Sequence, residues 1–382
     1  MTIALVVVGY NRPESMNRLL NTLLLAKYGN DTVDLVISID KGPNQQKVID
    51  VAECVKWVQG KKIIRSFTIK QGLRKHIIQC GDLTEQYDAV IVLEDDLVVS
   101  PYFYYYVKQV MCFYESEDRI AGISLYKHQT HPGVCRPFEP ANNGFDVFMM
   151  QFAMSWGQCW TKHMWRNFKD WYLKNENKDL SQDGILPTYI SNWNKQSWLK
   201  YYMRYIVEND KYFVYPYFSF ASNASDLGEH CSIPNNDYQV SLSEGILEYR
   251  LPNFADAIKY DVFFERVNLC QEIFPELIGK KILDLYGDRI VYGDARYLIS
   301  TKALPFKVVK EFQLKYRPIE HNCLNPDDGV GVIVYDLSVK AAIPKVNNAI
   351  VTRYDVRAIH WKKLLFLGFI GLIDALKRRV NK

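Results

Sequence analysis

The sequence predicts an α/β protein with a mostly parallel central sheet, and three observations in its first hundred residues support this fold class. The first is an alternation of strand-like and helix-like segments, namely Ile3–Val8, Glu14–Ala26, Leu35–Ile39, Gln46–Gln59 and Lys62–Thr68. The second is a continuous apolar run further along, and the third is a carboxylate cluster that follows this run. Strand, helix, strand, helix, strand is the usual beginning of a parallel sheet with right-handed crossovers.

Each element of this opening follows from its own residues. Residues 3–8 are apolar and mostly β-branched, which is typical of a strand. Pro13 fits the first turn of the following helix, whose apolar face comes from leucines at helical spacing, namely Leu19, Leu20, Leu23 and Leu24. Residues 35–39 form a second strand, which Asp40 and the Gly42-Pro43 pair bring to an end.

Later segments continue the pattern with less regularity. The predicted elements are helices at Gln71–Gln86, Tyr102–Tyr114 and Trp198–Val207, and strands at Arg119–Leu125 and Tyr212–Phe220. Residues 127–147 are rich in Pro, Gly, Asn and His, so we expect a loop there. His128 and His131 have no partner at metal-ligand spacing, and we expect them on the surface of that loop.

An acidic cluster follows the most strongly apolar strand. Residues Val90–Leu93 form a run typical of a strand that is buried on both faces, and Glu94, Asp95 and Asp96 come directly after it. Three carboxylates beside a core strand are costly unless a cation or hydrogen-bond donors meet them. Ligands of open α/β sheets bind at such strand ends, and Mg²⁺ or Mn²⁺ can share its ligands between carboxylates and phosphate. The alternative is a solvated acidic turn, and a lysine or arginine of the chain paired with Asp96 would remove the reason for a cation.

At this point the sequence resembles a known group of enzymes. Glu94-Asp95-Asp96 after an apolar strand resembles the variant DXD motif of nucleotide-sugar glycosyltransferases with the GT-A fold. Further segments resemble bacterial, family-2-like glycosyltransferases akin to the N-acetylglucosaminyltransferase I family; they are Gly72-Leu73-Arg74, Cys80-Gly81-Asp82-Leu83 and Ser100-Pro101-Tyr102-Phe103. The resemblance covers about residues 1–232. It implies a GT-A fold, which is Rossmann-like, and an inverting, metal-dependent sugar transfer.

The resemblance also implies a nucleotide site. In GT-A enzymes the loops after the first two strands hold the uracil and the ribose, so Tyr10, Arg12 and Asp40 become candidates for these contacts. The alternative for Asp40 is a simple turn with Gly42. Arg74 becomes a candidate for the diphosphate because arginine forms bidentate bonds to phosphate oxygens, and its alternative is a solvent-facing side chain.

The metal is expected at the acidic cluster. By the resemblance, Asp96 ligates Mn²⁺ or Mg²⁺ bridging the diphosphate, while Asp95 and Glu94 orient the ribose and the metal's ligands. A Gly-x-His loop closes the catalytic domain of many glycosyltransferases, so His230 is a second candidate metal ligand. Neutral imidazole is a competent Mn²⁺ ligand, but a lone histidine is more often structural.

The sugar and the acceptor need two further groups. Trp156 or Trp160 could stack on the apolar face of a sugar ring, and the alternative is that both are core residues. An inverting transfer needs a carboxylate that takes the proton of the acceptor hydroxyl. We favour Asp183, which precedes Ser197-Trp198 much as an acidic residue precedes a Ser-Trp helix in the resembled group. The other candidates are Asp170, Asp179 and Glu208.

Composition limits the class of protein and its partners. The chain has 382 residues, of which 48% are hydrophobic and 24% charged, an ordinary globular balance. Its formal net charge of +4 is too small to argue for nucleic acid. Its eight cysteines show no zinc-type or redox-type spacing. Because no secretory signal opens the chain, we expect a reducing cytoplasm.

The chain divides into three predicted parts. Residues 1–243 are the glycosyltransferase domain and 244–358 a smaller α+β accessory region, with strands expected at Leu314–Glu320 and Val330–Tyr335. Residues 359–382 contain Trp361 and an apolar run, Leu364 to Ile373, between basic clusters at 362–363 and 377–379. This run is half of what spans a bilayer, so we predict an amphipathic helix that lies on an anionic membrane surface. The alternative is a terminal helix docked on the core.

Together these patterns predict a glycosyltransferase at the inner face of the cytoplasmic membrane. It would move a sugar from a nucleotide-sugar, expected to be a UDP-sugar, to a saccharide or lipid-linked saccharide during bacterial surface polysaccharide assembly. One alternative is a sugar nucleotidyltransferase, which would also place carboxylates at a strand end. A second alternative is a carbohydrate-binding protein that keeps the fold without catalysis.

Overall fold

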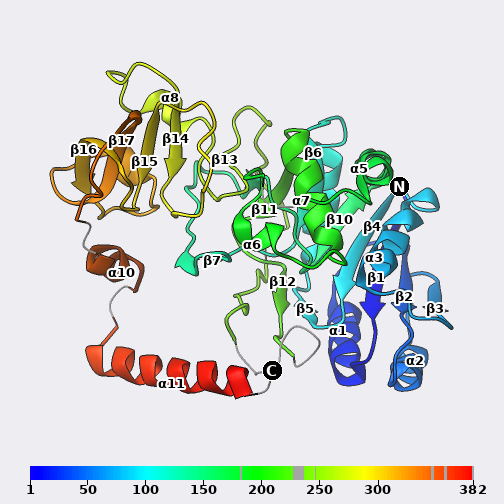
Figure 1. Ribbon diagram of the computed structural model, residues 1–382. Helices are drawn as coiled ribbons and strands as arrows, with labels where there is room; N and C mark the ends of the chain where they lie inside the picture. The colour runs from blue at the N-terminus through cyan, green and yellow to red at the C-terminus, as the bar shows by residue number, and fades with distance from the viewer. Residues whose placement is uncertain (181–182, 227–235, 246, 346–347, 357–358, 381–382) are drawn as a thin grey trace. The chain divides into compact units, whose positions relative to one another are not determined.

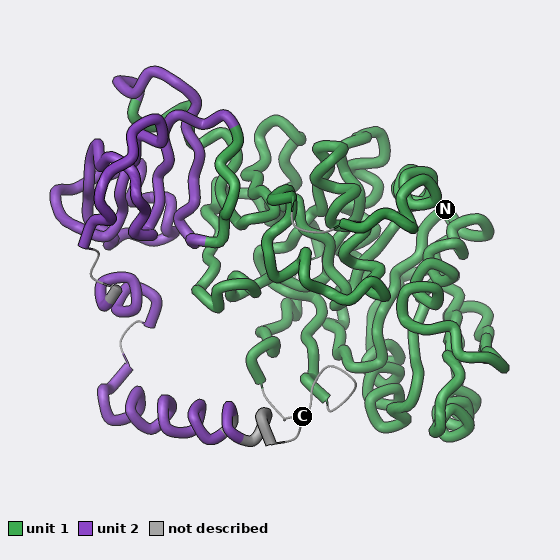
Figure 2. The backbone as a smooth tube through the Cα atoms, in the orientation of Figure 1, with its two compact units in different colours: residues 1–274, 288–293 green, residues 275–287, 294–382 purple. Residues whose placement is uncertain are grey.

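A computed structural model describes residues 1–180, 183–226, 236–245, 247–345, 348–356 and 359–380. The chain forms two compact units (Figure 2). Unit 1 comprises residues 1–274 and 288–293, and unit 2 comprises residues 275–287 and 294–382. The predicted division of the chain into residues 1–243, 244–358 and 359–382 stays a prediction.

Unit 1 is built on a nine-stranded sheet (Figure 1). In sheet order its strands are β13 (Lys259–Tyr260), β9 (Val147–Met150), β11 (Tyr212–Pro216), β6 (Ile120–Ser124), β10 (Gln158–Thr161), β4 (Ala89–Glu94), β1 (Ile3–Gly9), β2 (Val33–Ile39) and β3 (Lys62–Ser66). Strands β3, β2, β1 and β4 are mutually parallel, and β10 runs antiparallel between β4 and β6. Strand β11 is parallel to β6, β9 is antiparallel to β11, and β13 is parallel to β9. The predicted α/β class with a mostly parallel central sheet is confirmed.

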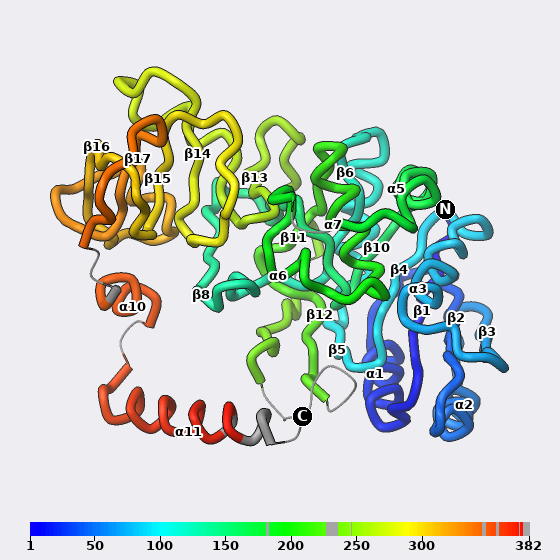
Figure 3. Tube along the Cα trace, viewed as in Figure 1, coloured from blue at the N-terminus to red at the C-terminus, as the bar shows by residue number. Residues whose placement is uncertain are grey.

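Helices connect these strands along the chain (Figure 3). They are α1 (Pro13–Leu25), α2 (Gln45–Cys54), α3 (Leu73–Gly81), the 3-10 helix η1 (Asp82–Glu85), α4 (Phe103–Phe113), α5 (Lys162–Asn175), α6 (Thr188–Ser191), α7 (Trp198–Glu208) and α8 (Leu269–Glu272). Helix α1 buries Met16, Leu19, Leu20 and Leu23, the face that the leucine spacing predicts, while Leu24 is exposed. These side chains join strands β1, β2 and β4 in one hydrophobic core.

Two short strand pairs complete unit 1. Strand β5 (Leu97–Val99) pairs antiparallel with β12 (Ala221–Asn223), and β7 (Thr130–His131) pairs with β8 (Arg136–Pro137) inside the predicted loop. The predicted strand at residues 212–220 therefore ends at Pro216, and a separate short strand follows it.

One edge of the sheet collects the loops that matter for function. Because β1, β2 and β4 are parallel, they all end at this edge, at Gly9, Ile39 and Glu94. Strand β6 ends there as well, at Ser124, because it and β4 are both antiparallel to β10. The carboxyl ends of parallel strands are where open α/β sheets bind their ligands.

Unit 2 contains a four-stranded sheet in the order β14 (Lys281–Asp284), β15 (Tyr297–Ser300), β17 (Gly331–Lys340) and β16 (Phe306–Gln313). Its helices are α9 (His321–Leu324), α10 (Asn348–Val356) and α11 (Trp361–Val380). The strand predicted at residues 314–320 is wrong, because the chain is paired earlier, over β16. Strand β16 mixes charged with apolar residues and is mostly exposed, so its sequence has no continuous apolar run that would predict a strand.

The predicted terminal helix is confirmed as α11. Its apolar residues 364–373 are consecutive and so occupy every side of the helix, and basic residues lie at the ends of the run rather than along one face. Within the described parts of the chain, no helix is both long enough and apolar enough to cross a membrane.

Candidate functional site

The acidic cluster lies against the loop that follows β1. The backbone N–H of Asp95 donates to the carbonyl of Val8 at 3.0 Å. Arg12, the last residue before α1, forms an ion pair with the carboxylate of Asp95. Its Nη1 and Nη2 also lie 3.3 and 3.2 Å from Asp96 Oδ2. The structure thus brings together Arg12, Glu94, Asp95 and Asp96.

Arg12 compensates only part of the negative charge of the cluster. One guanidinium contacts the carboxylates of Asp95 and Asp96, with Glu94 beside them, and Asp96 Oδ1 is buried with no hydrogen-bond partner among the described residues. Burial raises the pKa of Asp95 to about 6, although the charge of Arg12 opposes this. Burial also raises the pKa of Glu94, to which the charges of Asp96 and Asp95 add. Arg12 thus pairs with Asp96, the outcome that we expected to remove the reason for a cation. This pairing uses only Oδ2, so Oδ1 is the part of Asp96 that still favours a cation.

A divalent ion fits this cluster only in a limited way. Across the described ranges, no group of three or more His, Cys, Asp or Glu side chains could hold a metal ion by itself. The unpartnered oxygen of Asp96 could supply one ligand. Mg²⁺ and Mn²⁺ commonly bind through one or two carboxylates and take their other ligands from phosphate and water. The residues present thus fit a metal that arrives with a phosphorylated ligand.

Asp40 organises the neighbouring loop. Its side chain, which is buried, accepts hydrogen bonds from the backbone N–H groups of Lys41 and Gln71, both at 2.7 Å, and of Gly72 at 2.9 Å. Gly72 has a φ of 77°, which favours glycine, and it directly precedes α3. Asp40 therefore lies at the predicted edge of the sheet and fixes the loop before α3, while its binding of ribose stays a prediction.

Tyr10 lies half-buried in the loop after β1. The Lys70 ammonium lies 4.9 Å from the centre of its ring. The side-chain oxygen of Asn11 accepts a hydrogen bond from the backbone N–H of Asn44 at 3.1 Å, which ties this loop to the one after β2. A Cβ at Gly42 would lie 2.6 Å from the edge of the Tyr10 ring and still closer to Asn11, so only glycine fits there without a shift.

Arg74 is held by other parts of unit 1. It donates to the hydroxyl of Tyr172 at 2.8 Å and to the backbone carbonyls of Glu176 at 2.5 Å and Lys195 at 3.2 Å. Its guanidinium also stacks 4.1 Å above the ring of Tyr201. These contacts join α3 to α5 and α7, and none of them brings Arg74 to the acidic cluster.

An aromatic corner lies at the same edge as the acidic cluster, after β6 and before β10. Trp156 is half-buried, with Tyr126 edge-on at 4.8 Å between ring centres and Tyr238 at 4.7 Å. Tyr238 is 41% exposed, so the corner reaches solvent. Trp160 is fully buried and packs against Trp165 and Tyr202, which makes it a core residue.

The expectation that His128 and His131 lie on a loop surface is wrong. Both are buried, and aromatic rings, including Phe264, surround each of them. Burial lowers the pKa of His128 to about 3 and that of His131 to about 4. Most of the surrounding rings, among them Phe152, Tyr215 and Phe264, come from distant segments, which explains why local composition suggested exposure.

Asp183 lies at a different place. Its exposed carboxylate is 2.5 Å from Arg204 and accepts the backbone N–H of Ile185 at 3.1 Å. Burial raises the pKa of Asp183, but the hydrogen bonds from Arg204 and from the N–H of Ile185, together with the charge of Arg204, leave it below its ordinary value. Arg204 is near the end of α7, which leads into the start of β11, and that start is at the edge opposite the end of β4. The contacts of Asp183 do not bring it to the acidic cluster.

The remaining predicted residues are placed as follows. Asp170 and Asp179 are exposed, and Glu208 accepts hydrogen bonds from Arg204 at 2.6 Å and Trp171 at 3.0 Å. His230 lies outside the described residues.

Sequence analysis missed a second ion pair beside the cluster. The backbone N–H of Ala224 donates to the carbonyl of Asp96 at 2.8 Å. Two residues on, Asp226 forms an ion pair with Arg18 and accepts a hydrogen bond from Ser15 at 2.6 Å, both on α1. Burial raises the pKa of Asp226, but the hydrogen bonds from Arg18 and Ser15, together with the charges of Arg18 and Arg12, leave it lowered. The only signal in the sequence is the helical spacing of Ser15 and Arg18, which is common on any helix.

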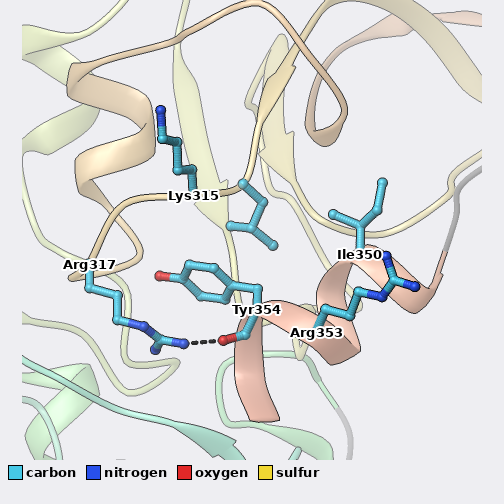
Figure 4. Close-up of a pocket in the computed structure, with 6 residues that line it drawn as sticks. Lys315, Arg317, Ile350, Arg353 and Tyr354 are labelled. Carbon is cyan, nitrogen blue, oxygen red and sulfur yellow. Dashed lines mark hydrogen bonds between the residues drawn. The ribbon is translucent and has the colours of Figure 1, made fainter. Parts of the chain in front are cut away.

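Unit 2 has a separate, shallow pocket of about 390 Å³ (Figure 4). It is lined by Leu314, Lys315, Arg317, Ile350, Arg353 and Tyr354. Arg317 donates to the carbonyl of Tyr354, and the side chains of Lys315 and Arg353 point in different directions. Its lining holds no carboxylate, so the chemistry predicted for the acidic cluster has no counterpart there.

Comparison with known proteins gives similarity at the level of fold. No protein-family model matches the chain, and no curated protein does. One similar structure is S. aureus TarS 1–349 in complex with UDP-GlcNAc, which is 13% identical with a TM-score of 0.39 over 61% of this chain and 61% of that chain. Another is the mannosyltransferase PcManGT from Pyrobaculum calidifontis in complex with GDP-Man and Mn²⁺, which is 9% identical with a TM-score of 0.30 over 42% of this chain and 44% of that chain. The chain thus spans less than two thirds of either structure.

Proposed function

We propose that the protein is a metal-dependent, inverting glycosyltransferase that moves a sugar from a UDP-sugar to a saccharide or lipid-linked saccharide acceptor. The observation that carries this proposal is the undercompensated carboxylate cluster at the carboxyl ends of parallel strands. Arg12 pairs with two of the three carboxylates there, and one buried oxygen of Asp96 has no hydrogen-bond partner among the described residues. The loops after β1 and β2, which carry Tyr10 and Asp40, end at the same edge.

The chain's own groups divide the work as follows. Asp96 is the residue that would hold Mn²⁺ or Mg²⁺. A bound ion would stabilise the negative charge that develops on the leaving diphosphate. Glu94 and Asp95 orient the ligands around Asp96. Tyr10 and the loop fixed by Asp40 bind the uridine.

The sugar is held at the aromatic corner. Trp156 offers a half-buried indole face beside Tyr238, and such a face covers the C–H side of a pyranose. Arg74 and His230 stay candidates for the diphosphate and the metal. For Arg74, binding would require giving up contacts with α5 and α7.

The contacts of Asp183 do not support its predicted role as general base. Asp183 remains the predicted base, but Arg204 stabilises its ionised form and so makes it a poorer proton acceptor. To serve as the base at the acidic cluster, Asp183 would have to approach the opposite edge of the sheet. A loss of transfer in Asp183→Asn with unchanged UDP affinity would support the role of Asp183.

Calorimetry with UDP tests the proposed function. We expect UDP to bind in the presence of Mn²⁺ and to bind much more weakly without it or in Asp96→Asn. The matched control is Asp118→Asn, which removes an exposed carboxylate that pairs with His163 at the surface. Equal UDP binding with and without Mn²⁺ would contradict metal dependence.

The product separates the proposal from its alternatives. With a panel of nucleotide-sugars, a glycosyltransferase releases UDP from the correct donor in a metal-dependent way. A sugar nucleotidyltransferase would instead form or consume pyrophosphate. A carbohydrate-binding protein would release neither.

We further propose that α11 places the protein on the inner face of the cytoplasmic membrane, where a lipid-linked acceptor would be. The apolar residues of α11 are exposed, including Leu365 at 67% and Phe369 at 61%, and Lys362 and Lys363 precede them. Apolar side chains flanked by cations suit an anionic lipid surface. If α11 were instead docked on the core, the apolar side chains that face the core would be buried.

Vesicle sedimentation tests the membrane proposal. The protein should sediment with vesicles that contain phosphatidylglycerol more than with phosphatidylcholine alone. Phe369→Glu should weaken binding about tenfold or more, because a buried phenylalanine contributes about 1.5–3 kcal/mol. Leu173→Glu, at an exposed leucine of unit 1, is the control and should have little effect. Equal sedimentation of both variants would refute the role of α11.

A further inference from the structure

We propose that Arg12 is an internal counter-ion that excludes the divalent cation from Asp96 until the diphosphate of a donor draws Arg12 away. This inference rests on the proposed function and deepens it. It makes metal and nucleotide bind together rather than one after the other.

The position of Arg12 places it in competition with a cation. Its guanidinium bridges Asp95 and Asp96 Oδ2, so a positive charge already lies where a divalent ion at Asp96 would be. Two cations cannot both approach one carboxylate closely without strong repulsion. Asp96 Oδ1 stays without a hydrogen-bond partner among the described residues, so Arg12 compensates Asp96 on one side only.

The side chain of Arg12 can leave Asp96 without a change in the backbone. Its backbone is fixed, because its carbonyl accepts the N–H of Met16 at 3.0 Å in the first turn of α1. Its side chain is 27% exposed, and its distances of 3.2 and 3.3 Å to Asp96 are those of a loose contact. Movement of Arg12 away from Asp96 therefore requires no backbone change, while its ion pair with the buried Asp95 is the contact that a diphosphate would have to replace.

Asp226, a further carboxylate near Arg12, does not offer it a second position. Asp226 lies close enough for the charge of Arg12 to affect it, but its oxygens already contact Arg18 and Ser15. A diphosphate, in contrast, brings new oxygens that a guanidinium binds in bidentate fashion. A donor would thus exchange one partner of Arg12 for another and open Asp96 to the ion.

Two titrations of Arg12→Gln test this inference. Without nucleotide, the variant should bind Mn²⁺ about tenfold or more tightly than the wild type, because the competing charge is gone. With saturating Mn²⁺, it should bind UDP about tenfold or more weakly, because the diphosphate has lost a ligand. Arg18→Gln is the matched control, since it removes an arginine of α1 that pairs with Asp226 rather than with Asp96, and both affinities should stay near wild type.

The outcomes are distinguishable. If Arg12→Gln binds Mn²⁺ with the same affinity as the wild type, the inference is overturned. The proposed function still stands in that case, provided that the wild type binds UDP in the presence of Mn²⁺. Tighter Mn²⁺ binding with unchanged UDP affinity also overturns it, because Arg12 would then not move to the diphosphate. If the wild type binds no UDP in Mn²⁺, the proposed function fails and the inference with it.

A second variant covers the case in which Arg12→Gln does not fold. The double variant Arg12→Gln/Asp95→Asn removes both charges of the buried ion pair, so neither is left uncompensated. It should bind Mn²⁺ about tenfold or more tightly than Asp95→Asn alone. Equal Mn²⁺ affinity of these two variants overturns the inference.

Discussion

Replacing Asp95 by asparagine should change how the stability of the protein depends on pH. Asp95 is only 3% exposed, and burial raises its pKa from an ordinary 3.8 to about 6. A carboxyl group with a raised pKa in the folded state stabilises that state while it is protonated. This contribution is fully present below pH 4 and is lost as the pH rises through 6. The amide that replaces the carboxyl group would keep the shape of the side chain without titrating.

The structure gives the size of this effect. Each pKa unit corresponds to about 1.4 kcal/mol of free energy. Ionisation of Asp95 should therefore lower the free energy of unfolding of the wild type by about 3 kcal/mol between pH 4 and pH 7. Buried histidines such as His76, whose pKa is lowered to about 4 by burial, change the stability of both proteins alike. The difference between Asp95→Asn and the wild type should thus shift by about 3 kcal/mol in favour of the variant.

Urea denaturation at several pH values between 4 and 7 measures this difference. The control is Asp31→Asn, because a hydrogen bond from Lys108 lowers the pKa of Asp31. A lowered pKa gives a contribution that is present at neutral pH and lost in acid, so the control should shift in the opposite direction. A difference for Asp95→Asn that stays constant over this range, or follows the sign of the control, would refute the reasoning.

Three further substitutions test the architecture of the candidate site. Gly42→Ala should push the Tyr10 ring aside and weaken UDP binding several-fold with little loss of stability, as calorimetry and urea denaturation would show. Asp40→Ala should lower the free energy of unfolding by about 3 kcal/mol, because three backbone N–H groups lose a charged acceptor, and a loss below about 1 kcal/mol would contradict this. Trp160→Ala should cost about 3–5 kcal/mol in urea denaturation, whereas Trp156→Ala should cost less and chiefly impair turnover of the donor; equal stability losses would argue against a binding role for the half-buried ring.

Local patterns were sufficient for much of the fold. The helix predicted at residues 14–26 is α1 at Pro13–Leu25, and the strand predicted at 3–8 is β1 at Ile3–Gly9. The helix is amphipathic and the strand is apolar, so the residues of each segment are sufficient to predict its conformation. Strand β16 escaped prediction because its charged residues face solvent at the edge of a small sheet, and only pairing with β17 makes it a strand.

The candidate site could be predicted only in part. The local sequence shows that carboxylates follow an apolar strand, and it also shows that the chain turns after β1. The partner of Asp95 is not visible, because Arg12 is 83 residues away in the sequence, and Arg18 is 208 residues from Asp226. Likewise, the hydrogen bonds that hold Arg74 come from a segment about 100 residues later. Such pairs arise from chain topology, which residue spacing does not contain.

The energetics of the acidic cluster connect its structure to its proposed role. Three carboxylates at one strand end, with one arginine between them, leave the folded protein less stable at neutral pH than a neutral cluster would. The excess negative charge lowers the stability of the folded state, so the cluster is hard to explain by a structural role alone. A ligand that brings positive charge recovers this free energy on binding, and a ligand that also brings phosphate gives Arg12 a new partner. The same imbalance that costs stability is therefore what would make a metal–nucleotide pair bind.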